Sequence, residues 1–103
     1  MIAGLLLTLA LTPLQAYNQG NQLYAHKDYA GAAAAYQQAL VAGPCAAVHY
    51  NLGNARFKSG QVGQAILEYR RARALDPADP DIAATNPRAT IATARKTNAF
   101  SWW

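Results

Sequence analysis

Apolar and polar positions along this chain recur with the spacing of helices. Alanines seven residues apart lie on one face of a helix, and this spacing occurs twice, as Ala32 with Ala39 and as Ala65 with Ala72. Pro44 and Pro77 follow these two segments and end them, because a proline has no amide hydrogen to donate and crowds the preceding turn. The pattern predicts five helices, near residues 12–26, 29–42, 46–59, 62–76 and 79–97.

Two of the predicted helix starts carry capping signals. Thr12-Pro13-Leu14-Gln15 provides a cap hydroxyl, a proline at the first helical position and a glutamine that reaches back to the cap amide. Asp79-Pro80 provides a cap and a first-turn proline for the last helix. Pro87 falls inside that helix, so we expect a kink, or a restart of the helix after Asn86.

The chain repeats itself with a period of 33 residues. The segment Y-N-Q-G-N at 17–21 matches Y-N-L-G-N at 50–54, and in the same register Tyr24 meets Phe57, Ala32 meets Ala65, Tyr36 meets Tyr69, Ala39 meets Ala72 and Pro44 meets Pro77. A period in the low thirties with two helical patterns per unit is typical of a helix-turn-helix solenoid. We therefore expect an all-α fold.

The matched residues have packing roles in such a fold. Gly20 and Gly53 are expected where the first helix of each unit crosses the second too closely for a side chain. Tyr36 and Tyr69 are expected to fill the larger space between the alanines of the second helices. These pairs predict two copies of one helical hairpin lying side by side.

Composition narrows the function classes. The 103 residues allow one small domain, and 52% hydrophobic against 14% charged residues predicts a folded chain. The net charge of +4 serves either solubility or attraction of an acidic partner. The single Cys45 forms no internal disulfide, and with two histidines it does not supply a zinc site. We expect no metal and no cofactor.

The start of the chain is apolar. Ile2 to Leu11 is an uncharged run with the length of a signal-peptide core and is too short to span a bilayer, although no Lys or Arg follows Met1. Cleavage after Ala10 would leave the Thr12 helix start intact, and cleavage after Ala16 is the poorer alternative. A buried helix packed on the domain and a retained membrane anchor remain alternatives. We expect an export signal and a periplasmic or membrane-associated protein.

The repeat resembles a known family. His49 to Ala83 looks like a consensus tetratricopeptide repeat (TPR) with its following helix, and both units carry the pattern, so the resemblance covers residues 13–84. The apolar leader, the two units, the G-Q-x-G-x-A-I turn and D-P-x-D-P-D-I resemble BatE-type proteins of bacterial aerotolerance operons. Gln19, Arg56 and Thr85-Asn86-Pro87 depart from that pattern, so we expect a weaker third helical layer and lower stability of the whole.

The resemblance implies an organisation and a location. It predicts a TPR-type α-solenoid of two helix-turn-helix repeats plus a C-terminal capping helix over residues 12–97, preceded by a signal-peptide-like or anchor segment at 1–11 and followed by an aromatic tail at 98–103. It also implies an exported protein that works beside membrane-anchored von Willebrand factor A-type partners. Trp102 and Trp103 in the tail fit a membrane interface or a chain that continues into a further segment.

In this fold the first helix of each unit lines a concave groove. The groove positions predicted to bind a peptide or a helix of a protein partner are Tyr17, Asn21, Tyr24, Tyr50, Asn54, Phe57 and Lys58, with Leu14, Ala25 and Ala47 beside them. Asn21 and Asn54 are expected to hold an extended peptide backbone through paired donor and acceptor groups. Such a groove predicts protein binding.

Other functions are disfavoured. His26 and His49 have no carboxylate or nucleophile at a catalytic spacing, so we expect structural roles for both and no enzyme activity. The basic residues spread around their helix rather than gathering on one face, which disfavours nucleic acid. Helix-pair solenoids usually need about three repeats. The alternative function is therefore self-association through open solenoid ends.

Overall fold

The computed structural model describes residues 10–96, apart from the side chains of residues 89, 93 and 94. All regular elements in this range are helical: α2 (Pro13–Ala25), α3 (Tyr29–Ala39), the 3-10 turn η1 (Leu40–Ala42), α4 (Ala46–Lys58), α5 (Val62–Leu75), α6 (Pro80–Ala84) and α7 (Pro87–Lys96). The all-α prediction is confirmed. The expected signal segment lies mainly, and the aromatic tail wholly, outside the described residues.

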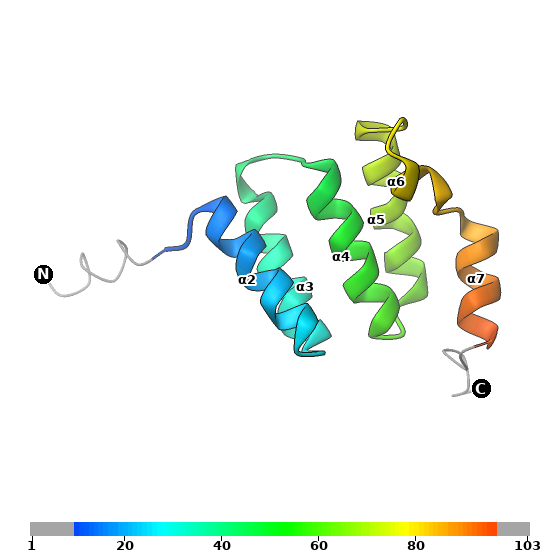
Figure 1. Ribbon diagram of the computed structural model, residues 1–103, viewed down its shortest axis with the longest axis horizontal. Coiled ribbons are helices and arrows are strands. Elements are labelled where there is room, and N and C mark those ends of the chain that lie inside the picture. Colours follow the sequence, from blue (N-terminus) through cyan, green and yellow to red (C-terminus); the bar gives the residue numbers. More distant parts are fainter. Residues whose placement is uncertain (1–9, 97–103) are drawn as a thin grey trace, which may run out of the picture.

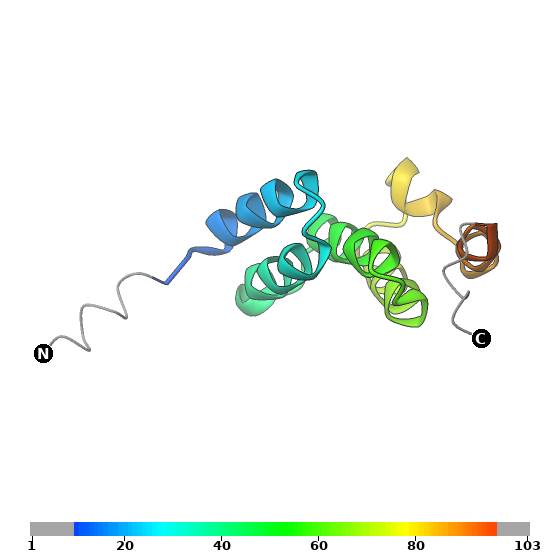
Figure 2. The ribbon, with the colours of Figure 1, turned by 90° about the horizontal axis from the view of Figure 1, so that it is seen from below.

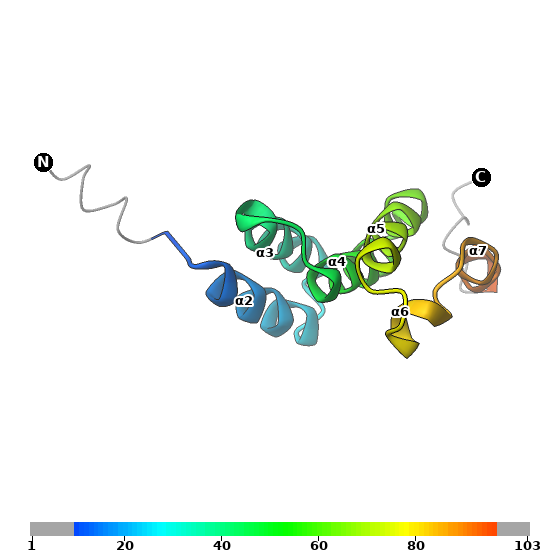
Figure 3. The ribbon, with the colours of Figure 1, turned by 90° about the horizontal axis from the view of Figure 1, so that it is seen from above.

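The helices form two layers. In Figure 1 the hairpin of α2 and α3 stands beside that of α4 and α5. Seen from above in Figure 3, α2, α4 and α6 lie along one side while α3 and α5 lie along the other, and Figure 2 shows the arrangement from below. This is the predicted stacking of two helical hairpins. The first helix of each hairpin faces the same side of the molecule.

The helix starts follow the capping signals. Thr12 Oγ1 accepts a hydrogen bond from the Gln15 amide at 3.2 Å, and the Thr12 amide donates to Gln15 Oε1 at 3.0 Å. Together these bonds close the predicted capping box. The Asp79 carboxylate accepts bonds from the amides of Asp81 and Ile82, so the predicted cap of α6 is present as well.

The predicted fifth helix is divided. The chain leaves the helical conformation at Thr85 and re-enters it at Pro87, as expected for a restart after Asn86. The third unit therefore presents five residues of α6 and then the separate helix α7, where the first two units present one continuous helix of 13 residues. The expected capping helix is thus broken.

The core lies between the two layers and is rich in alanine. Ala32, Ala65 and Ala72 are fully buried and Ala39 is nearly so, as the spacing predicted. The Tyr36 ring fills the space at Gly20: a Cβ at residue 20 would stand 2.5 Å from Tyr36 Cε1. The equivalent distance from residue 53 to Tyr69 Cε1 is 2.6 Å. The glycines therefore make room for a tyrosine ring from the second helix.

Candidate functional site

The tyrosine and asparagine side chains of α2 and α4 form one connected surface. The Tyr17 ring lies 6.0 Å from that of Tyr36, and the Tyr50 ring lies 5.9 Å from that of Tyr69. A third pair, Tyr24 with Tyr29, packs edge to face at 5.2 Å. Tyrosines thus line the first helix of each hairpin, backed by tyrosines of the second helix.

Two asparagines are oriented by buried tyrosines. The Tyr36 hydroxyl donates to Asn21 Oδ1 at 2.7 Å, and the Tyr69 hydroxyl donates to Asn54 Oδ1 at 2.6 Å. Each acceptor oxygen already serves a tyrosine and keeps one further lone pair, so the prediction that both groups of each amide hold a peptide backbone stays a prediction. Each Nδ2 group has no hydrogen-bond partner among the described residues and is free to donate.

A third asparagine joins the two hairpins. Asn51 of α4 donates from Nδ2 to the Tyr17 hydroxyl at 2.9 Å and lies 3.5 Å from Asn21 Oδ1. This bond holds the first helices of both units in register across their shared surface. Asn51 is not among the groove residues predicted from the sequence. The identical Y-N pairs at 17–18 and 50–51 gave no signal that only the second asparagine faces its neighbour.

Burial raises the pKa values of three tyrosines in or behind this surface. Burial, with a smaller effect from neighbouring Tyr17 and Tyr24, raises the pKa of Tyr36 to about 12. Burial is also the main cause of the raised pKa values of Tyr24 and Tyr69, and the nearby Tyr50 raises both values further. The hydroxyls therefore stay protonated at neutral pH and act as hydrogen-bond donors.

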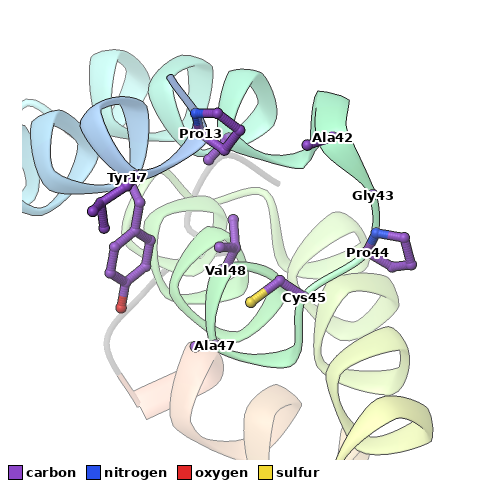
Figure 4. A pocket seen from close by; sticks show the side chains of 10 residues that line it. Pro13, Tyr17, Ala42, Gly43, Pro44, Cys45, Ala47 and Val48 are labelled. Atoms are coloured by element: carbon purple, nitrogen blue, oxygen red, sulfur yellow. The ribbon is translucent and has the colours of Figure 1, made fainter. Parts of the chain in front are cut away.

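The upper end of this surface is hollowed. A pocket of about 380 Å³ lies between the start of α2, the loop before α4 and the start of α4, as Figure 4 shows. Its lining residues are all uncharged: Pro13, Leu14, Tyr17, Ala39, Ala42, Gly43, Pro44, Cys45, Ala47 and Val48. The volume lies within the range of about 300–1,000 Å³ that is typical of ligand pockets. The loop residues of this pocket were not predicted from the sequence.

The predicted site residues occupy two regions. Tyr17, Asn21, Tyr24, Tyr50 and Asn54 belong to the tyrosine and asparagine surface just described, and all except the exposed Asn21 are half-buried. Phe57, which is half-buried, and Lys58, which is exposed, end α4. Within residues 10–96, no hydrogen bond or ring contact joins the side chain of Phe57 or Lys58 to the other predicted groove residues. Their place in the groove stays a prediction.

His49 has a partner that the sequence did not reveal. Its Nδ1 lies 2.7 Å from Glu68 Oε2, and Glu68 Oε1 accepts a bond from Arg71 at 2.7 Å. Both His49 and Glu68 are buried, and this contact was not predicted from the sequence. The pair joins α4 to α5 inside the second hairpin. His26, in contrast, is exposed and bonds only the backbone of its own helix.

Within residues 10–96, no group of three or more histidine, cysteine, aspartate or glutamate side chains is arranged to hold a metal ion. None of the helices in that range combines the length and hydrophobicity that crossing a bilayer requires.

The sequence comparison decides the family. The model of the family described as tetratricopeptide repeat matches residues 17–80, more than half of the 103-residue chain. The chain belongs to the tetratricopeptide repeat family. No curated protein matches it. TPR proteins generally act as protein-interaction modules without catalytic activity, and they typically bind proteins. In this TPR chain the tyrosine and asparagine surface of α2 and α4 is therefore the candidate binding groove.

Proposed function

We propose that this TPR domain binds an extended segment of a protein partner along the groove formed by α2 and α4. The proposal is carried by the orientation of Asn21 and Asn54. Each amide oxygen accepts the hydroxyl of a buried tyrosine, and each Nδ2 group has no hydrogen-bond partner among the described residues. Two fixed donors, one per repeat, suit the repeating carbonyl groups of an extended peptide.

The groove also offers apolar contact at little entropic cost. Tyr17, Tyr24 and Tyr50 are half-buried, and ring packing restrains their rotation. Because these side chains are ordered before binding, less conformational entropy is lost when a partner covers them. Phe57 and Lys58 extend the same helix and would meet the far end of the bound segment.

The proposed setting is the bacterial cell envelope, with membrane-anchored von Willebrand factor A-type proteins as partners. Its support is the uncharged run from Ile2 to Leu11 and the resemblance to BatE-type proteins. Secretion of a reporter fused after residue 16 tests the location. A reporter that stays in the cytoplasm would refute an export signal.

Binding is tested by selecting peptides from a displayed random library and measuring their affinity by calorimetry. The variant Asn21→Asp/Asn54→Asp keeps an oxygen for each tyrosine hydroxyl and replaces each Nδ2 donor by an acceptor. We expect at least about tenfold weaker binding, since every 1.4 kcal/mol changes an affinity tenfold. Asn18→Asp is the matched control, because Asn18 is exposed, carries the same substitution and forms no groove contact. Equal affinity of both variants and the original would refute the proposed donors.

Self-association is the second candidate. The broken third unit leaves the solenoid without a complete capping helix, and Leu67 and Leu75 on α5 are 46% and 47% exposed. Large exposed apolar side chains favour the association of copies. Light scattering over a range of concentrations tests this. A mass that stays monomeric would exclude it.

A further inference from the structure

The pocket at the Tyr17 end of the groove is suited to aliphatic side chains. No charged residue lines it, so a charged ligand group would lose its hydration there without gaining a partner. Leu14, one of its walls, is 67% exposed and thus leaves apolar surface uncovered. Figure 4 shows Cys45 and Val48 between Tyr17 on one side and the Gly43-Pro44 loop on the other.

The chain itself carries a segment with matching chemistry. Residues 2–9 read I-A-G-L-L-L-T-L, without a charged side chain, and they precede the pocket wall Pro13 by only a few positions. Residues 1–9 span up to about 30 Å when extended, at roughly 3.3–3.6 Å per residue. The segment is therefore long enough to turn back at Ala10–Thr12 and reach the pocket between α2 and α4.

We propose that residues 2–9 dock in this pocket and cover the Tyr17 end of the groove. This proposal rests on the proposed function, since it makes the segment a tethered competitor of the partner. A linked competitor acts at an effective concentration in the millimolar range. The partner then binds fully only when the segment is withdrawn, either by cleavage or by insertion into a membrane. Removal of the leader would thus open the binding site.

Cys45 is a built-in reporter of this docking. It is the single cysteine of the chain, it is exposed in the described structure, and it lines the pocket. A docked segment shields its thiol, and labelling then depends on the fraction of time for which the pocket is open. The reaction of Cys45 with a water-soluble maleimide therefore measures docking without any partner.

The test compares the full 103-residue chain with its Leu5→Gln/Leu7→Gln variant, which makes the segment polar without adding charge. We expect Cys45 to react about tenfold faster in the variant, because two leucine side chains no longer favour the closed state. The control Ala30→Gln/Ala34→Gln places the same amides on exposed positions of α3 and should leave the rate unchanged. Equal rates for the original chain and the Leu5/Leu7 variant would overturn the proposal.

A cross-link identifies the occupant. In a Leu6→Cys chain, a short bismaleimide should join residue 6 to Cys45 within one molecule, giving a product of monomer mass. A product of dimer mass, or none, overturns docking within the same chain. The peptide selected above should also bind about tenfold more tightly to the Leu5→Gln/Leu7→Gln chain. If the peptide binds neither form, the proposed function fails, while the Cys45 rates still decide the docking.

Discussion

The ring of Tyr36 occupies the space that a side chain at Gly20 would need. An added Cβ at residue 20 would stand 2.5 Å from Tyr36 Cε1, and Tyr36 is 2% exposed, so the ring has no room to yield. The Tyr36 hydroxyl also orients Asn21, the residue directly after Gly20 in α2. The packing of the hairpin and the orientation of the groove donor therefore depend on the same tyrosine.

Gly20→Ala should destabilise the domain. The methyl group overpacks against the Tyr36 ring, which typically costs about 1–3 kcal/mol. Gly63→Ala is the matched control: nothing lies within 4 Å of its added Cβ, and alanine is the better helix former by roughly 0.5–1 kcal/mol. Urea unfolding followed by circular dichroism measures both. A Gly20→Ala protein as stable as the Gly63→Ala protein would contradict this packing.

The two hairpin turns differ at one residue. Lys27 has φ of +64°, whereas Gly60, 33 positions later, has φ of +80°. A left-handed conformation strains a residue with a Cβ by roughly 1 kcal/mol, and glycine adopts it freely. Lys27→Gly should therefore raise the free energy of unfolding by up to about 1 kcal/mol, and Gly60→Ala should lower it by a similar amount. Thermal and urea unfolding should show changes of opposite sign in the free energy of unfolding of the two variants. Changes of the same sign would argue against strain at these turns.

The His49–Glu68 pair should show energetic coupling. The equivalent positions in the first hairpin are Ala16 and Ala35, which are both buried. Removing Glu68 alone leaves buried His49 without its acceptor, at a cost of roughly 1–3 kcal/mol. The double variant His49→Ala/Glu68→Ala should then cost less than the two single variants added together. Strict additivity in a double-mutant cycle would rule out the coupling.

Arg71→Ala provides the control for this cycle. Its side chain is 52% exposed although it bonds to Glu68, so its loss should cost less than about 1 kcal/mol. A cost as large as that of Glu68→Ala would mean that Arg71, rather than His49, is the main partner of this carboxylate.

Alkaline pH should weaken the fold through the tyrosines. The pKa of Tyr36 is about 12 in the folded chain against an ordinary value of 10.0, so the unfolded chain loses this proton first. The resulting stability is fully present below pH 10 and is lost as the pH rises towards 12. We expect the free energy of unfolding to fall by roughly 1–3 kcal/mol over this window. Tyr36→Phe should show a flatter pH profile, and an unchanged slope would refute the assignment.

The sequence predicted the helices well because their signals are local. The capping box at Thr12, the cap at Asp79 and the restart at Pro87 each involve residues within one helical turn. The 33-residue repeat added the order of the elements, since two similar hairpins bury their apolar faces best when stacked. Alanine spacing and the glycine-tyrosine matches identified the buried faces without any knowledge of contacts.

The groove was predicted only in outline. Asn21 and Asn54 were assigned to it by their helix face, but the use of their oxygens by Tyr36 and Tyr69 depends on how closely the two helices of each hairpin approach. Asn51 and Asn18 occupy matching positions in the repeat. Among the described residues, the first hairpin precedes Asn51, and Asn51 packs against it by donating to the Tyr17 hydroxyl.

By itself, the sequence determined that this chain is a helical repeat, where its helices begin and end, and which faces are apolar, because these properties depend on nearest neighbours and on periodicity. Only the tertiary structure decided that Glu68 meets His49 and that an apolar pocket opens between α2 and the loop at Cys45. Contacts of this kind join residues far apart in the chain. Their geometry follows from the angle and spacing of packed helices, which no local pattern records.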